Sequence, residues 1–383
     1  MSILWLIALL AGGVTYTRFV LRALRGIHRL GRIEANSPVS RGSTSVIIAA
    51  RNEEDWIGGT IESLLVQQLD FSRNPLEIII VDDRSGDRTS EIVESYARKF
   101  SNIKLVKQKT VPPDVSPKKA ALALGISQSQ GEVILLTDAD CLHDPGWVKV
   151  MCQTLAEKDA MAIGQARFIV PHNAPLWQRL QALDFAAQGV LSAGLVAAGT
   201  PYNCSGASLA FTREAFNRVG GWVGFDQFIS GDDELLMRRF IAHNIPVIAS
   251  TGLASVVMTR PPVSLTELWH QRTRWGSKTL HYPADQKAVL SGIFVFYLAL
   301  SLTPLFALSW PLFIAAIAAF NCKVALDRSL IIASQSLYGD KFRFGEFFLT
   351  ELLHPPVIVV LAILGAFGSF DWKGTTYKTK GTA

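Results

Sequence analysis

The apolar positions of the chain follow two patterns. Between about residues 40 and 285 they form short runs of aliphatic and β-branched residues, separated by mixed polar segments. Before and after that region they form long stretches without charge. Short runs are typical of buried strands, whereas about 20 apolar residues are enough for a helix to cross a bilayer. The pattern predicts an α/β domain with transmembrane helices on both sides of it.

Four short runs predict the strands of this domain. They are SVIIAA (45–50), LEIIIV (76–81), IKLV (103–106) and VILLT (133–137). Helices are expected between them, near 53–67, 88–99 and 117–128. Regular alternation of strand and helix predicts a doubly wound, largely parallel sheet, and ligands of such sheets bind beyond the carboxyl ends of the strands.

The longest uncharged stretch contains no Asp, Glu, Lys or Arg in the 32 residues from 289 to 320. Because Pro304 and Pro311 interrupt it, we expect a transmembrane hairpin over 286–327 rather than one long helix. A further transmembrane helix is expected over 346–370, where the chain is again strongly apolar.

At the N-terminus, residues 1–24 are expected to form a membrane anchor. An uncharged segment comes first and is followed by Arg18, Arg22, Arg25, Arg29 and Arg32. Positive charge after the apolar segment favours a retained anchor with a cytoplasmic flank over a cleaved signal peptide. This orientation places the domain of residues 40–285 in the cytoplasm and makes the chain a multi-pass protein of the cell membrane.

Two features leave the topology open. The apolar stretch 184–200 has a short uncharged part and predicts a packed or interfacial helix rather than a crossing. One anchor and three further crossings would place the C-terminal tail outside the cell, yet Lys373, Lys378 and Lys380 favour the cytoplasm. One apolar segment is therefore expected to be interfacial or re-entrant.

The formal charge of +5 does not require a nucleic-acid partner, because much of the excess lies beside the apolar segments, where Lys and Arg are expected. No RNA-binding signature appears, and no nucleic acid is expected among the partners. The four cysteines lack the CxxC spacing of metal sites. Without an H-x-x-x-H or a G-x-S-x-G motif, the key residues of zinc and serine hydrolases are missing.

Acidic residues follow three of the four predicted strands. Glu53 comes after the first, Asp82 and Asp83 after the second, and Asp138 and Asp140 after the fourth. One such cluster could cap a helix, but three clusters in a shared crevice would repel one another unless a cation lay among them. Mg²⁺ or Mn²⁺ with an anionic ligand fits, because hard cations take oxygen ligands.

Several motifs occur in order over about residues 43–280. They are SVIIAARNEE, IIIVDDRSGDRT, PKKAALALG, ILLTDAD, GDDELLMRRF and QRTRWGSK. In order and spacing they resemble the membrane-associated family 2 glycosyltransferases, a group that includes cellulose synthase, hyaluronan synthase and ceramide glucosyltransferase. The resemblance implies a GT-A type nucleotide-sugar-binding fold, a UDP-sugar donor, a divalent metal and inversion at the anomeric carbon.

The resemblance also implies roles in donor binding. The nucleoside would meet Glu53 and Asp83 with Asp82 close by, the ribose or diphosphate Asp138 and Lys118, and the metal Asp140 as its direct ligand. One position departs from the family pattern. An Asn that often follows the lysine by five positions is Ala123 here, which puts one donor contact in question.

On the acceptor side, Asp233 matches the catalytic base, and Asp232 takes a place where the family usually has Glu. By themselves these acids could equally cap a helix. In QRTRW, the resemblance places Arg274 against the leaving diphosphate, Trp275 at the wall of the acceptor site and Gln271 in contact with substrate. Without it, such a basic aromatic cluster could simply anchor a helix at the membrane interface.

These features predict a membrane-bound inverting glycosyltransferase that moves a sugar from a UDP-sugar to a hydroxyl of a lipid-type acceptor. Asp233 would take the acceptor proton, and a metal at Asp140 would neutralise the diphosphate. About four predicted crossings are few for a channel that exports a polymer, which favours a lipid over a growing glycan. Two alternatives stay open: a polysaccharide synthase subunit, and a non-catalytic membrane scaffold that retains the fold.

Overall fold

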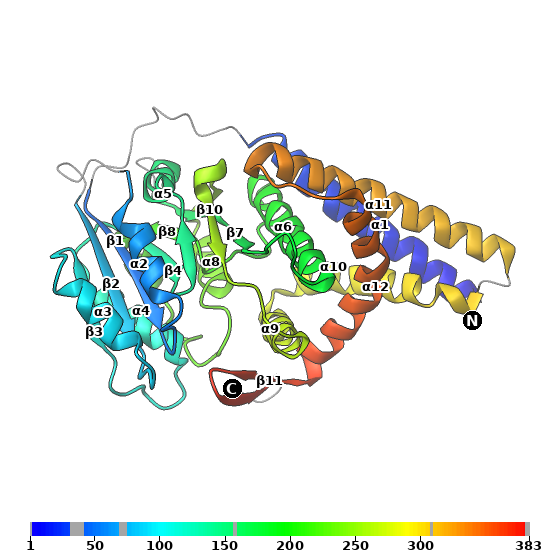
Figure 1. Cartoon of the computed structure of the whole chain (residues 1–383). Coiled ribbons are helices and arrows are strands. Elements are labelled where there is room, and N and C mark those ends of the chain that lie inside the picture. The colour runs from blue at the N-terminus through cyan, green and yellow to red at the C-terminus, as the bar shows by residue number, and fades with distance from the viewer. Residues whose placement is uncertain (1, 31–41, 69–74, 156–158, 307–308, 380–383) are drawn as a thin grey trace.

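The computed structural model describes residues 2–30, 42–68, 75–155, 159–306 and 309–379. It combines an α/β domain with a group of long helices (Figure 1). Three of these helices project away from the domain: α1 (Ser2–Ile27), α10 (Ala284–Ser301) and α11 (Trp310–Tyr338). The N-terminus lies at the far end of this projection, whereas the C-terminal residues return to the α/β domain.

The main sheet of the described residues has seven strands in the order β3-β2-β1-β4-β8-β6-β9. Four neighbouring strands are parallel: β1 (Thr44–Ala50), β2 (Leu76–Asp82), β3 (Ile103–Lys107) and β4 (Val133–Asp138). The other strands are β6 (Met161–Ile163), β8 (Leu209–Thr212) and β9 (Val247–Ala249). Because β8 runs antiparallel to β4 and β6, the sheet is mixed. The predicted doubly wound domain is confirmed, with its parallel strands where the aliphatic runs place them.

Helices cover both faces of this sheet. They are α2 (Ile57–Leu65), α3 (Thr89–Ala97) and α5 (Trp147–Leu155) on one face and α4 (Pro117–Ser127) on the other. Side chains alternate along β1, so that Val46 and Ile48 belong to one core and Ile47 to the other. Burial on both faces explains why these strands are continuous aliphatic runs, and it leaves the polar residues to gather at the strand ends.

A second, three-stranded sheet joins the α/β domain to the helices. It consists of β5 (Cys141–His143), β7 (Gln165–Phe168) and β10 (Val256–Thr259). The helices of this region are α6 (Leu176–Ala197), α7 (Arg213–Val219), α8 (Glu234–Ala242) and α9 (Leu265–Ser277). Helix α6 packs against both β7 and α1. A Cβ atom on Gly26 of α1 would lie 1.8 Å from the Gly194 carbonyl oxygen of α6, so this close approach requires glycine.

Four described helices are long and apolar enough to cross a membrane: α1, α6, α11 and α12 (Phe344–Phe367). The region of the expected hairpin contains α10 and the first part of α11. Pro304 lies in a short 3₁₀ turn between them, and Pro311 lies in the first turn of α11, where a missing N–H costs nothing. Helix α12 runs across the projecting helices rather than beside them (Figure 1).

A β-hairpin follows α12, formed by β11 (Ser369–Trp372) and β12 (Thr375–Lys378). Its turn residues, Lys373 and Gly374, both have positive φ, at 49° and 78°. Such angles are required in a two-residue type I′ turn, which glycine favours. The hairpin packs against α9, so that residues from the end of the sequence lie at the edge of the α/β domain (Figure 1).

Candidate active site

A cavity of about 1240 Å³ lies at the carboxyl ends of β1, β2 and β4 and continues between the long helices. Glu53, Asp83, Asp138 and Asp140 line its strand-side wall. Every residue that the sequence nominates for the site also lines this cavity, except Asp82. The fold therefore brings residues from all the quoted motifs to one place.

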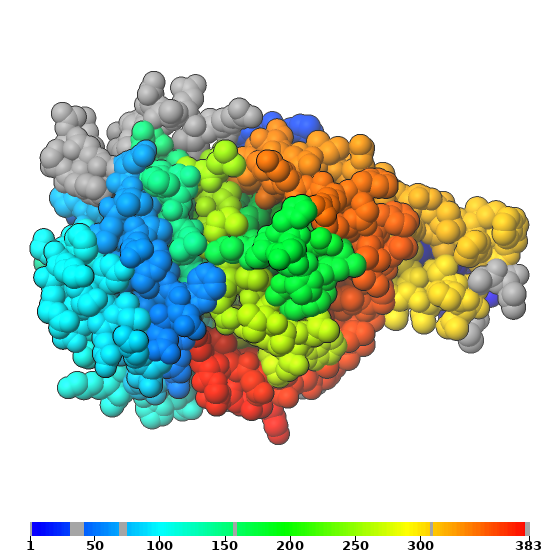
Figure 2. Space-filling view, in the orientation of Figure 1, coloured from blue at the N-terminus to red at the C-terminus, as the bar shows by residue number. Residues whose placement is uncertain are grey.

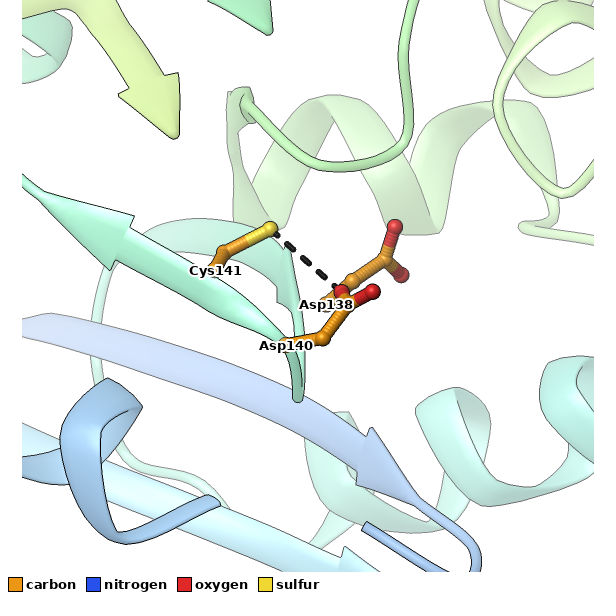
Figure 3. A group of neighbouring side chains, drawn as sticks. All are labelled: Asp138, Asp140 and Cys141. Carbon is orange, nitrogen blue, oxygen red and sulfur yellow. Dashed lines mark hydrogen bonds between the residues drawn. The ribbon is translucent and has the colours of Figure 1, made fainter. Parts of the chain in front are cut away.

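Asp138 and Asp140 lie side by side at the end of β4 (Figure 3). One ligand atom from each, together with the Cys141 sulfur, forms a group in which all atoms lie within 4.8 Å of one another. Burial, with the neighbouring charges of Asp138 and Glu53, raises the pKa of Asp140 to about 6. A cation beside Asp140 would stabilise the ionised form of this carboxyl group.

The chemistry of this group fits a hard divalent cation. Burial and the charges of Asp140 and Asp138 raise the pKa of the Cys141 thiol well above its usual range, so the sulfur keeps its proton. The thiol donates to Asp140 Oδ1 at 3.8 Å (Figure 3). The two carboxylates are thus the available ligands, and oxygen ligands suit Mg²⁺ or Mn²⁺, whose other positions water and phosphate oxygens fill.

Lys118 lies between the acids at the end of β4 and the acids that precede α8. Its ammonium lies 2.8 Å from Asp138 Oδ1 and 2.9 Å from Asp232 Oδ2. Burial opposes the charge of Lys118, but the two carboxylates outweigh burial and raise the pKa of the lysine. Burial also opposes the charge of Asp232, and Lys118 reverses the effect, so that the pKa of Asp232 falls to about 2. Lys118 and Asp232 are therefore both charged at neutral pH.

Asp233 is the N-cap residue of α8 and also faces the cavity. One of its oxygens accepts from the Glu234 N–H at 2.7 Å, and the other accepts from the Gly206 N–H at 3.0 Å. Lys278 Nζ lies 3.6 Å from Asp233 Oδ1. Capping and catalysis are compatible here, because the capping bonds hold the carboxylate in the cavity, where it can accept a proton from a hydroxyl.

Helix α9 presents Gln271, Arg274 and Trp275 to the cavity. The Trp275 ring stacks on Phe185, with the ring centres 5.5 Å apart. Arg272 Cζ lies 4.9 Å from the centre of the same ring. The side-chain oxygen of Gln271 is buried and has no hydrogen-bond partner among the described residues. A ligand in the cavity can satisfy this oxygen, as buried polar groups normally require.

Asp82 and Asp83, the adjacent acids at the end of β2, differ in their access to the cavity. Asp83 lines it and accepts from Gln108 Nε2 at 2.9 Å and from Arg84 Nε at 2.8 Å. Asp82, the last residue of β2, accepts from the Ser85 N–H at 3.2 Å and does not line the cavity. Successive side chains of an extended chain point to opposite sides, so only one of two adjacent acids faces a ligand there.

The C-terminal hairpin supplies cavity residues that none of the motifs contains. Lys373 Nζ lies 2.6 Å from Glu53 Oε1, and Arg274 Cζ lies 5.7 Å from the centre of the Trp372 ring. Figure 2 shows these C-terminal residues, in red, between the blue part of the α/β domain and the yellow-green α9. The Lys-Gly turn is a sequence signal for a hairpin, but no local signal indicates its contact with Glu53.

Lys119 is a second residue that sequence reasoning left without a role. It is 1% exposed, and its ammonium donates to the carbonyls of Phe225, Phe228 and Ser230 at 2.9, 2.5 and 3.2 Å. Burial lowers the pKa of Lys119 to about 8, although the acids nearby favour its charge. The three carbonyls belong to the loop that leads into Asp232, so Lys119 fixes the loop that positions the acids before α8.

Comparison with known families matches the regions of the chain that contain the site residues. The family described as Glycosyl transferase family 2 matches residues 45–220, and Glycosyl transferase family group 2 matches residues 133–367. The mannosyltransferase PcManGT from Pyrobaculum calidifontis, solved in complex with GDP-Man and Mn²⁺, has the same fold, with a TM-score of 0.61 at 19% identity. That similarity covers 95% of this chain and 99% of the other.

Two curated relatives are similar in sequence. The probable glycosyltransferase YdaM of Bacillus subtilis (strain 168) is 28% identical over 284 residues, which are 72% of this chain and 64% of that protein. Beta-monoglucosyldiacylglycerol synthase of Synechocystis sp. is 26% identical over 245 residues, which are 62% of this chain and 48% of that protein. The chain therefore spans between about half and two thirds of the length of these relatives.

The longer family match decides the assignment. Its range, residues 133–367, amounts to 235 of the 383 residues and includes Asp140, Asp233 and the whole of α9. The strand order, the strand-end acids and the comparisons agree, and the chain belongs to glycosyltransferase family 2.

Proposed function

We propose that this protein is a membrane-bound inverting glycosyltransferase that transfers a sugar from a UDP-sugar to a hydroxyl of a lipid acceptor at the cytoplasmic face of the membrane. The observation that supports this most strongly is the shared cavity. Charged residues at the strand ends form one wall, and apolar residues of the long helices form another. A nucleotide sugar suits the first wall, and a lipid suits the second.

The donor is expected at the strand-side wall. Glu53 and Asp83 are acceptors and suit the N–H and O–H groups of a nucleoside. Lys118 and Arg274 offer positive charge to the diphosphate. A Mg²⁺ or Mn²⁺ ion held by Asp140, with Asp138 beside it, would supply further positive charge against the diphosphate. The Mn²⁺ and GDP-Man in the PcManGT complex are consistent with such a site, and the family resemblance favours UDP as the nucleotide.

Asp233 is proposed as the general base. As the acceptor oxygen bonds to the anomeric carbon, its proton passes to the Asp233 carboxylate, and the bond from that carbon to the UDP oxygen breaks. Attack from the side opposite the leaving group inverts the configuration at that carbon. Lys118 and Arg274 stabilise the negative charge that develops on the departing diphosphate.

The lipid acceptor is inferred from the helices. Beyond the catalytic acids, the cavity is lined by apolar residues of α1, α10, α11 and α12, such as Phe19, Ile293, Leu330 and Ile358. The relative from Synechocystis sp. is named as a synthase of beta-monoglucosyldiacylglycerol, and this name supports a glycolipid product here.

We assign three membrane crossings to α1, to α11, and to α10 together with the uncharged 3₁₀ turn that follows it (Thr303–Phe306), and place α12 along the cytoplasmic interface. Helix α12 packs against α9 and leads into the hairpin whose Lys373 contacts Glu53. The C-terminal hairpin therefore lies on the same side of the membrane as the α/β domain. An N-terminus outside the cell and three crossings satisfy this condition, and they also agree with the arginines after α1.

Lipid analysis of cells tests the proposal. Membrane lipids are compared by mass spectrometry between cells that express the wild-type protein and cells that express Asp233→Asn at the same level. The expected result is a lipid species that carries one added hexose or N-acetylhexosamine only with the wild-type protein. Identical lipid profiles, or a long polymer in place of a single addition, would contradict the proposal.

A further inference from the structure

Polar side chains converge on the cavity from the long, largely apolar helices. They are Tyr16 of α1, Asp184 of α6, Tyr297 of α10, Asp327 of α11, and Glu351 and His354 of α12. We call these residues the helix cluster. They line the same cavity as the catalytic acids but belong to none of the motifs that define the donor site.

One part of the helix cluster surrounds a buried lysine. Lys323 is fully buried, and its ammonium lies 2.8 Å from Asp327 Oδ2 and 2.5 Å from Glu351 Oε2. The Tyr16 hydroxyl donates to Asp327. The lysine lies behind the two carboxylates, and only the carboxylates and the tyrosines reach the cavity. This arrangement leaves acceptor oxygens and hydroxyl groups on the cavity wall.

The other part connects the cluster to the catalytic helix α9. Arg272 Nη2 lies 2.8 Å from Asp184 Oδ2, and His354 Nε2 lies 3.5 Å from Asp184 Oδ1. Gln188 Nε2 also donates to Asp184 at 2.8 Å. Because Arg272 lies over the ring of Trp275, the cluster extends from the acceptor side of the active site into the helices without a break.

Pairing between helices alone does not explain this placement. Charged and polar groups in membrane helices are costly, and they normally face a partner, a water-filled space or a ligand. Here they face a cavity of about 1240 Å³, larger than the roughly 300–1,000 Å³ of usual ligand pockets. Apolar residues such as Phe294 and Ile331 line the cavity next to them. A polar group with apolar chains attached matches both kinds of lining.

We propose that the helix cluster binds the polar group of the acceptor lipid and selects an uncharged, hydroxyl-bearing lipid over a lipid phosphate. The inference rests on the proposed function and defines its acceptor class. In this part of the cavity, the acids Asp184, Asp327 and Glu351 outnumber the cations Arg272 and Lys323, and Lys323 lies behind the carboxylates rather than at the wall. A lipid hydroxyl can donate to these carboxylates, and ester oxygens can accept from the tyrosines and His354, whereas a phosphate would meet the carboxylates first.

Lipid binding is measured without transfer, so that it does not depend on the reaction. The full chain in detergent is mixed with diacylglycerol or with phosphatidic acid of the same acyl chains, and the bound lipid is counted by native mass spectrometry. These lipids differ only in the phosphate. We expect the wild-type protein to retain diacylglycerol at least about tenfold more strongly. Equal retention, or stronger retention of phosphatidic acid, would overturn the proposal.

Variants locate the binding site. Tyr16→Phe and His354→Phe each remove hydrogen-bonding atoms from the cavity wall and should weaken diacylglycerol retention by about fivefold to tenfold. Tyr338→Phe is the matched control, since Tyr338 is a buried tyrosine of α11 that bonds to the Ser250 carbonyl and does not line the cavity. The control should retain diacylglycerol as the wild-type protein does.

Two further measurements distinguish a failure of the lipid-binding inference from a failure of the proposed function. UDP binding in the presence of Mn²⁺ should be unchanged in Tyr16→Phe and His354→Phe, because neither substitution alters the strand-side wall of the cavity, where the donor is expected. If the variants lower the melting temperature but keep wild-type retention of diacylglycerol, the cluster is purely structural and the inference is wrong. If diacylglycerol is retained selectively but no UDP-sugar is consumed, the proposed function fails while the binding site stands.

Discussion

Single carboxylates in the cavity differ in what compensates their charge. Asp232 is buried and Asp140 is partly buried, and burial raises the pKa of a carboxyl group. Asp232 has Lys118 at 2.9 Å, whereas Asp140 has Arg260 at 3.8 Å and lies beside Asp138. The pKa of Asp232 is accordingly about 2 and that of Asp140 about 6. Asp140 is therefore the carboxylate that gains more from a bound cation.

The raised pKa of Asp140 predicts how metal affinity depends on pH. Below pH 6 the free protein holds a proton on Asp140, and a metal ion must displace that proton. We expect the dissociation constant for Mn²⁺ to rise about tenfold per pH unit below about pH 6 and to be nearly constant above about pH 7. Titration calorimetry at several pH values measures it. An affinity that does not change between pH 5 and pH 7 would contradict the assignment.

Asp233→Asn tests the proposed base. The one amide oxygen of asparagine can still accept from the Glu234 N–H, so α8 should keep its cap, while the bond from the Gly206 N–H to the other oxygen is lost. Because the amide cannot take the acceptor proton, we predict that kcat falls by about 10² to 10⁴-fold, while UDP affinity stays within about twofold. Steady-state kinetics and UDP titration check the two parts. Wild-type kcat in this variant would remove Asp233 from the mechanism.

At the scale of elements, the C-terminal hairpin borders the strand-side wall of the cavity, where the donor is expected. Lys373 is its tip residue and the ion-pair partner of Glu53. We predict that Lys373→Met weakens UDP binding by about fivefold to tenfold, because it removes a positive charge and leaves Glu53 to repel the nucleotide. Lys378→Met is the control, since it makes the same charge change on β12, outside the cavity. Equal effects of the two variants would indicate general electrostatics rather than a donor contact.

The loop before α8 depends on one buried lysine. In Lys119→Met, the carbonyls of Phe225, Phe228 and Ser230 lose a donor that reaches all three. We predict a loss of about 1–3 kcal/mol in stability, with a lower melting temperature and a reduced kcat, since the loop leads to Asp232 and Asp233. The exposed Lys109→Met is the comparison. If both variants melt at the same temperature, Lys119 does not fix the loop.

The elements differ in how well the sequence predicts them. β1, β2, β3 and β4 begin and end within one residue of their expected bounds. Burial on both faces makes β1, β2 and β4 mainly aliphatic runs, whereas β3, at the edge of the sheet, is only partly buried. The motifs likewise place Asp138, Asp140, Asp233 and Arg274 at one cavity. Strand-end acids follow their strands directly, so their position is a local property of the sequence.

Other parts depend on contacts between distant residues and were not predictable. Asp82 and Asp83 are adjacent and chemically identical, and only the direction of the chain after β2 decides that Asp83 alone faces the cavity. The contact between Lys373 and Glu53 joins residues 320 positions apart. In the sequence, Lys119 is one more charge in a predicted helix, whereas its role depends on a loop about one hundred residues away in the sequence.

At the scale of the whole molecule, the cavity joins two environments. The α/β domain can bind a water-soluble nucleotide sugar, and the long helices can hold an acceptor that does not leave the membrane. Helix α6 contacts both β7 and α1, and α12 contacts both α9 and α10, so the two parts are packed together along the cavity. We infer that one active site receives its substrates from two phases.

Transfer by the purified chain in lipid nanodiscs tests this claim most directly. The nanodiscs contain diacylglycerol, Mn²⁺ is present, and a series of UDP-sugars is added one at a time. We expect at least one UDP-sugar to yield equal amounts of free UDP and of monoglycosylated lipid with inverted anomeric configuration, and Asp233→Asn to yield neither. UDP release without any lipid product, or product with retained configuration, would contradict it.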